Sequence, residues 1–136
     1  MKTLKILFFL LVIAAIPGCR KGGCNVIPDF QFRTPAISLI QYSKLTVPAG
    51  ADTIRGGLCG IILINDGREI RAFDRCSTVN PHERNAVILD GVLARDPESG
   101  AVYNLMGMGF PTQIAECPLK PYLVQWYGDN SFYIVN

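Results

Sequence analysis

The hydrophobic and polar positions divide the chain into two parts. Residues 4–16 are apolar except for Lys5 and follow Lys2, whereas the apolar residues after position 26 come in short runs between turn signals. The first run has about a dozen residues, which is short of the roughly 20 that a membrane-spanning helix needs. A basic start followed by a short apolar run is typical of an export signal. A buried core helix is the alternative, but such helices seldom lie at the extreme N-terminus.

The second part of the chain predicts β-strands. Residues 60–64 (GIILI) form a continuous β-branched run, which indicates a strand buried on both faces. A tight-turn signal, Asn-Asp-Gly, follows at 65–67, and residues 69–73 then alternate strictly, so we expect a hairpin. A second hairpin is expected from 86–89 and 92–94 around Asp90-Gly91. Further strands are expected at 30–32, 36–39, 102–105, 122–126 and 132–135.

No helical period is apparent after the export segment. Nine prolines and thirteen glycines fit many turns and few helices. We therefore expect residues 26–136 to form one all-β domain, a small sandwich or barrel of short antiparallel strands. The aromatic residues at strand spacing are expected to pack in its core; they are Tyr103, Phe110, Tyr122, Trp126, Phe132 and Tyr133.

The export segment ends with the sequence Ile16-Pro17-Gly18-Cys19, which resembles a bacterial lipobox. The resemblance implies that residues 1–18 are removed as a signal peptide, that the thiol of Cys19 carries the lipid, and that residues 19–25 form a tether. More than one acyl chain on a residue gives stable membrane anchoring. The expected location is the bacterial cell envelope, with the domain facing the periplasm or the cell surface. Ordinary secretory cleavage, which would release the domain, is the alternative.

The charge balance of the mature chain limits the kinds of partner that it is expected to bind. Two of the 13 basic residues lie in the removed segment, which leaves 11 against 11 acidic residues. This balance does not support a nucleic-acid partner.

Four cysteines remain after Cys19, at positions 24, 59, 76 and 117, and an oxidising compartment permits disulfides among them. The sequence allows three complete pairings. The position of Cys24 in the tether suggests that a cysteine of the domain is free.

Catalytic and metal-binding patterns are not found. The chain has one histidine, His82, and the sequence around its serines and threonines does not form a nucleophile elbow. Five residues separate Cys76 from His82, and the chain has no second pair with the spacing of zinc ligands. Gly107-Met108-Gly109 is better explained as a turn than as a phosphate-binding loop. We expect no enzymatic activity.

Residues 60–136 nevertheless resemble the Rieske-type domain, a small β-fold that normally holds a [2Fe–2S] cluster. The resemblance rests on a strand that leads into Cys76, on the segment 96–104, on Gly107, Gly109 and Pro111, and on the run from Pro118 to Val124. Residues 27–61 resemble exported Rieske-fold lipoproteins of bacteria. Together these parts cover about 110 of the 136 residues.

The resemblance also places the four positions of the cluster ligands. Cys76 falls at the first cysteine and Thr78 at the first histidine; after 17 intervening residues, Asp96 falls at the second cysteine and Ser99 at the second histidine. A Rieske cluster needs two cysteines and two histidines, and hydroxyl groups are poor ligands for it. The resemblance therefore implies a degenerate site without a cofactor. We expect Asp96 and Ser99 to cap backbone amides, and Cys76 to be buried and inert or paired with Cys59 or Cys117.

These observations predict a non-enzymatic, lipid-anchored binding or structural module, or an accessory subunit of an unknown envelope protein. The alternative is a Rieske [2Fe–2S] electron-transfer protein, such as a ferredoxin-like subunit of a nitrite reductase or ring-hydroxylating dioxygenase. Thiol redox chemistry at Cys76, or at a pair of Cys59 with Cys76, is a third possibility, although the chain lacks a Cys-x-x-Cys motif.

Overall fold

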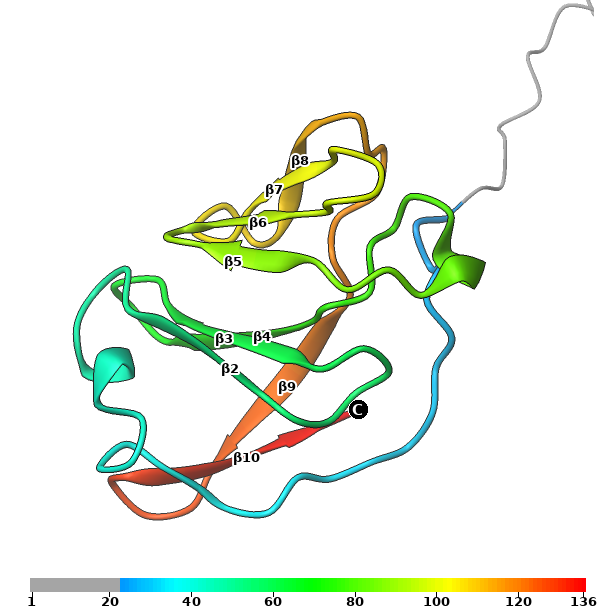
Figure 1. The fold of residues 1–136 in the computed structure, drawn as a ribbon. Coiled ribbons are helices and arrows are strands. Elements are labelled where there is room, and N and C mark those ends of the chain that lie inside the picture. Colours follow the sequence, from blue (N-terminus) through cyan, green and yellow to red (C-terminus); the bar gives the residue numbers. More distant parts are fainter. Residues whose placement is uncertain (1–22) are drawn as a thin grey trace, which may run out of the picture.

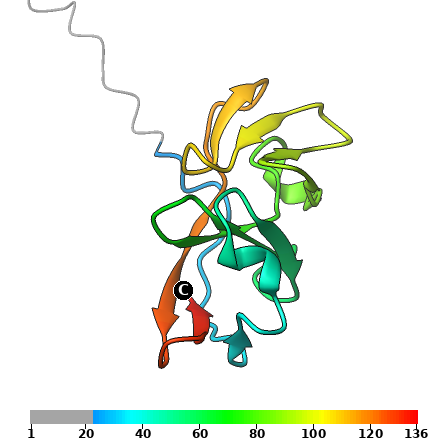
Figure 2. The same ribbon diagram turned by 90° about the vertical axis from the view of Figure 1, so that its left-hand side faces the viewer.

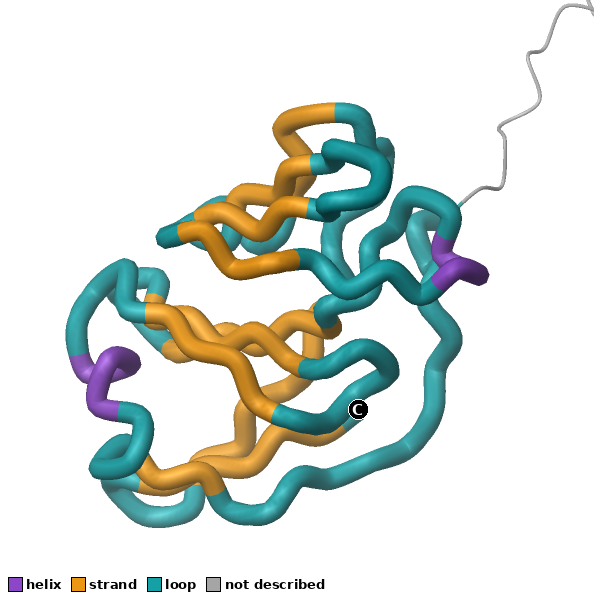
Figure 3. Tube along the Cα trace, viewed as in Figure 1, coloured by secondary structure: helices purple, strands orange, loops and turns teal. Residues whose placement is uncertain are grey.

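The computed structural model describes residues 23–136, so the predicted export segment and Cys19 lie outside the described residues. The described chain forms two antiparallel sheets (Figures 1 and 3). The larger sheet has the order β1 (Ile37–Ser38), β10 (Ser131–Val135), β9 (Pro121–Trp126), β4 (Ile70–Asp74), β3 (Ile61–Asn65), β2 (Ala51–Ile54). The smaller sheet has the order β5 (Ile88–Asp90), β6 (Leu93–Arg95), β7 (Val102–Asn104), β8 (Phe110–Gln113).

Helical structure within residues 23–136 is limited to two 3₁₀ turns, η1 (Ser43–Thr46) and η2 (Pro81–Glu83). The expected all-β fold class is therefore confirmed. Neither turn is long and apolar enough to cross a bilayer.

Strand β3 lies between two hydrophobic cores, as its continuous apolar sequence predicts. Ile61 and Leu63 pack in the core between the strands of the larger sheet, together with Phe132 and Ile134. The alternate residues of β3 pack in a second core beneath the smaller sheet, which lies over β3 and β4 in Figure 1. The members of this second core are Ile62, Ile64, Phe73, Val87, Ala94, Ala101, Tyr103, Leu105 and Leu119.

Both predicted hairpins are confirmed. Strands β3 and β4 pair with Leu63 opposite Ala72, and β5 and β6 pair with Leu89 opposite Ala94. The carboxylate of Asp66 caps the first turn, because it accepts the amides of Arg68 and Glu69 at 2.9 Å each. Hydrogen bonds from these amides, with Arg71 beside them, lower the pKa of Asp66 to about 2.

Several local expectations are wrong. Residues 30–32 do not form a strand, and the only β-bridge beside them joins Arg33 to Val135. The side chain of Phe32 packs against the core of the larger sheet instead. Two strands were not predicted, β2 and β8. Both lie at sheet edges, and β8 contains Pro111, which an edge strand tolerates because proline has no N–H to donate and one side of an edge strand needs no backbone partner. Two aromatic side chains expected in the core are half exposed, Phe110 at 57% and Trp126 at 49%.

All four cysteines of the described residues are paired, so the expectation of a free cysteine is wrong. One disulfide joins Cys24 to Cys117, in the segment between β8 and β9; the other joins Cys59 to Cys76. The first pairing is possible because residues 24–29 lie against the segment that enters β9 (Figure 2). Ile27 is only 2% exposed there, and Asp29 forms an ion pair with Lys120.

Candidate functional site

The loop after β4 contains the first two predicted ligand positions. Cys76 is fully buried, and its sulfur is bonded to that of Cys59, with the two Cα atoms 5.0 Å apart, within the usual range for a disulfide. The hydroxyl of Thr78 donates to the backbone carbonyl of Cys117 at 2.7 Å. Its amide donates to the hydroxyl of Tyr103 at 3.0 Å, and the two hydroxyl oxygens are 2.9 Å apart. The side chains of Cys76 and Thr78 are thus engaged within the protein.

The turn after β6 contains the other two positions. The hydroxyl of Ser99 donates to Asp96 Oδ2 at 2.6 Å, and Asp96 Oδ1 accepts the amide of Glu98 at 2.9 Å. Ser99 Oγ also accepts the amide of Ala101 at 3.2 Å. The expectation that Asp96 and Ser99 cap backbone amides is therefore confirmed.

The carboxylate of Asp96 is held in its charged form. Burial alone raises its pKa, but hydrogen bonds from the hydroxyls of Ser99 and Ser77 and from backbone amides lower it more, so that its pKa lies below the ordinary value. Ser77 is itself fully buried and lies 3.2 Å from the hydroxyl of Tyr103. Ser77 has no role in the sequence-based predictions, yet it links the loop after β4 to the turn after β6. A contact of this kind has no signal in the sequence, because it forms between two segments that are distant along the chain.

Besides the four predicted ligand positions, a cluster of possible metal ligands lies around Asp74, at the start of the loop after β4. One ligand atom each of Cys59, Asp74 and Cys76 lies within 4.8 Å of the others, but the two sulfurs are bonded to each other. The carboxylate of Asp74 is fully buried and accepts four donors. They are the amides of Leu58 (2.6 Å), Cys59 (3.3 Å) and Cys76 (2.7 Å) and the hydroxyl of Tyr122 (2.6 Å).

The environment of Asp74 is built to fit a carboxylate. Burial, and then the hydrogen bond to Asp74, raise the pKa of Tyr122 well above its usual range, so that its hydroxyl stays a donor. Gly57 has a φ of 60°, and a Cβ atom at this position would lie 2.5 Å from Asp74 Oδ2. The sequence did carry a signal for this residue. Asp74 continues the alternation of Ile70 and Ala72, which face the core, so it is expected to point inward.

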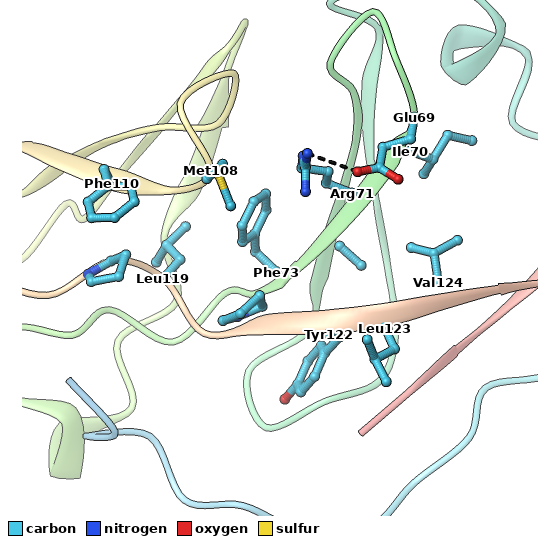
Figure 4. A pocket seen from close by; sticks show the side chains of 13 residues that line it. Glu69, Ile70, Arg71, Phe73, Met108, Phe110, Leu119, Tyr122, Leu123 and Val124 are labelled. Carbon is cyan, nitrogen blue, oxygen red and sulfur yellow. Dashed lines mark ion pairs between the residues drawn. The ribbon is translucent and has the colours of Figure 1, made fainter. Parts of the chain in front are cut away.

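An apolar groove lies next to Tyr122, the residue whose hydroxyl donates to Asp74 (Figure 4). Strands β4 and β9 pair only at Ala72 with Tyr122 and at Phe73 with Pro121, and the space beyond these pairs opens into a groove of about 350 Å³. Three of its lining side chains are largely exposed, Met108 at 55%, Phe110 at 57% and Leu123 at 65%. This groove was not predicted from the sequence.

The only histidine of the chain belongs neither to the four predicted ligand positions nor to the cluster around Asp74. His82 lies exposed in the 3₁₀ turn η2, within the loop that follows Cys76.

No protein-family model matches the chain, and no curated protein matches it. One similar solved chain comes from a complex of reduced oxygenase and oxidized ferredoxin in carbazole 1,9a-dioxygenase. It is 19% identical, with a TM-score of 0.49, and the match covers 78% of this chain and 94% of that chain. A likeness at this level says nothing of a bound group or an activity.

Proposed function

We propose that this chain is a lipid-anchored cell-envelope protein whose Rieske-like domain carries no cluster and acts as a non-enzymatic binding or structural module. The observation that carries the proposal is the state of the four positions that the resemblance assigns to cluster ligands. The sulfur of Cys76 is in a disulfide, and the polar side-chain atoms of Thr78, Asp96 and Ser99 are used in hydrogen bonds within the protein.

The donor set does not suit an iron–sulfur cluster. Such a cluster needs thiolate and imidazole ligands, whereas three of these positions offer hydroxyl or carboxylate oxygen, which hard cations prefer. Reducing the disulfide would free two thiols, of which only that of Cys76 stands at an assigned ligand position, and the chain has one histidine for the two that are needed. Electron transfer through a Rieske cluster is therefore the weaker candidate.

Two features support export and binding. Two disulfides, in a chain whose N-terminus resembles a lipoprotein signal, fit an oxidising compartment outside the cytoplasm. The groove between β4 and β9 offers an apolar surface of the kind that binds partners.

Iron reconstitution under exclusion of oxygen tests the missing cluster. The native processed chain is treated with iron, sulfide and a thiol reductant, beside a variant that carries Cys59→Ala, Thr78→His, Asp96→Cys and Ser99→His. We expect the native protein to stay colourless and iron-free while folded by circular dichroism. Stoichiometric iron with visible absorption in the native protein would make electron transfer the leading function. Iron uptake by the variant alone would support the assignment of the four positions.

Mass spectrometry of the membrane fraction tests the anchor. We expect the mature chain to begin at a diacylated or triacylated Cys19, and the Cys19→Ala variant to lose both processing and lipid. A mature, unlipidated protein in the soluble fraction would instead support ordinary secretory cleavage.

A further inference from the structure

The disulfide between Cys24 and Cys117 fixes where the proposed anchor meets the domain. Only five residue steps separate Cys19 from Cys24, and a fully extended chain spans at most about 3.6 Å per residue, or about 18 Å here. Since the Cα atoms of the disulfide-bonded Cys24 and Cys117 are 5.2 Å apart, the lipid on Cys19 holds Cys117 within about 23 Å of the bilayer.

This segment is one wall of the apolar groove. Pro118, Leu119 and Pro121 line the groove on one side and a second, smaller cavity that contains Cys24 on the other. The amide of Leu119 donates to the carbonyl of Gly109 at 3.0 Å. This hydrogen bond places Gly109 next to the segment that carries the Cys24–Cys117 disulfide. The side chains of Met108 and Phe110, on either side of Gly109, therefore lie close to the disulfide as well.

The groove face is apolar and uncharged over most of its length. Residues 99–115 and 121–128 contain no charged side chain, and Met108, Phe110 and Leu123 are more than half exposed. The charges that line it, Glu69 and Arg71, pair with each other at 2.8 Å at one end (Figure 4). Exposed apolar side chains next to a short anchor would lower their free energy by entering the interfacial region of the membrane.

We propose that this groove face, formed by Met108, Phe110, Pro118, Pro121 and Leu123, is the membrane-contacting surface of the domain, and that its partner is the bilayer that holds the lipid. The inference rests on the proposed lipidation of Cys19. It fixes the orientation of the domain, because the opposite end of the larger sheet, where β1 pairs with β10, then points away from the membrane (Figure 1).

Fluorescence quenching by brominated lipid tests the orientation. Trp126 is the single tryptophan, so Trp126→Phe gives a background without tryptophan. Into this background Phe110→Trp or Leu123→Trp places a reporter on the groove face. Ile40→Trp places the control reporter at an equally apolar site, 83% exposed, just after β1. Each full chain is produced in lipidated form and reconstituted into phosphatidylethanolamine–phosphatidylglycerol vesicles with and without bromine on the acyl chains.

We expect the reporters at 110 and 123 to be quenched several-fold more than the reporter at 40. Equal quenching at all three sites, with the lipid on Cys19 verified by mass spectrometry, overturns the membrane-facing surface and leaves the anchor intact. Absence of the lipid overturns the anchor and this inference together. The two groove variants serve as replicates, so that misfolding of one, detected by circular dichroism, does not remove the test.

Discussion

Replacing Asp74 by asparagine tests how the first loop is held. The carboxylate of Asp74 accepts four donors, two on each oxygen: Oδ1 receives the amides of Cys59 and Cys76, and Oδ2 receives the amide of Leu58 and the hydroxyl of Tyr122. Asparagine keeps one of these oxygens and turns an NH₂ group toward the other pair of donors. Either orientation leaves at least one backbone amide facing a donor, although the Tyr122 hydroxyl can rotate.

The magnitude follows from these bonds. A hydrogen bond to a charged group contributes about 1.5–3 kcal/mol, and a buried donor left without a partner costs roughly 1–3 kcal/mol. Because the carboxylate itself loses hydration on burial, the full sum is not recovered. We expect Asp74→Asn to lower the free energy of unfolding by about 3 kcal/mol, a large part of the roughly 5–15 kcal/mol typical of a domain.

Urea unfolding of the oxidised chain from residue 20 onward, followed by tryptophan fluorescence and circular dichroism, measures this loss. Asp90→Asn is the matched control, because the Asp90 side chain is 60% exposed and pairs with Arg95 on the surface; its loss is expected to stay below about 0.5 kcal/mol. Tyr122→Phe completes a double-mutant cycle, with an expected coupling of about 1 kcal/mol to Asp74→Asn. If Asp74→Asn is neutral or stabilising, the desolvation cost dominates and the reasoning is refuted.

Three further predictions follow from the same structure. Tyr103→Phe removes the hydroxyl that accepts the amide of Thr78 and is expected to cost about 1–3 kcal/mol in urea unfolding, whereas Tyr127→Phe, at a residue 68% exposed, changes little. Asp66→Asn tests pH dependence: its pKa falls from 3.8 to about 2 on folding, so its stabilisation is full above about pH 4 and is lost as the pH falls through about 2. The stability gap between native protein and Asp66→Asn should therefore close on acidification, and a constant gap would contradict the assigned pKa. Removing a disulfide should cost more for the Cys24–Cys117 pair, with a sequence separation of 93, than for Cys59–Cys76, with 17; chain entropy gives about 4.7 against about 3 kcal/mol, and thermal unfolding of the paired alanine variants measures the order.

The strongest local signals predicted the centre of the fold. The run at 60–64 and the Asn-Asp-Gly turn gave the β3–β4 hairpin, since a continuous β-branched strand and a tight turn leave few alternatives. The edge strands β2 and β8 were missed because an edge needs only half of its backbone bonds, and so tolerates Asp52 and Pro111. Residues 30–32 alternate like a strand, but Phe32 packs on the ring of Tyr122 instead, a tertiary contact that no local pattern encodes.

The local hydrogen bonds of the candidate site could be predicted from the sequence, whereas its disulfide and its long-range hydrogen bonds could not. Asp96 and Ser99 stand three apart in a Pro- and Gly-containing turn, so their local capping followed from sequence. The disulfide pairing did not, because it depends on which loops meet. The same limit hid Ser77 and Tyr103, whose contact joins residues 26 positions apart.

The disulfide between Cys59 and Cys76 connects the proposed loss of the cluster to the compartment in which the chain is expected to work. A sulfur that is bonded to another sulfur cannot also be a thiolate ligand, so an environment that keeps this pair oxidised also keeps position 76 unavailable to iron. Under this proposal, two other connections stand in for the crosslink that a cluster would supply between the loops. The disulfide ties the first loop to the β2–β3 connection, and Ser77 and Tyr103 bring it against the smaller sheet. Both connections hold the first loop without a metal ion, which agrees with the proposed scaffold that carries no cluster.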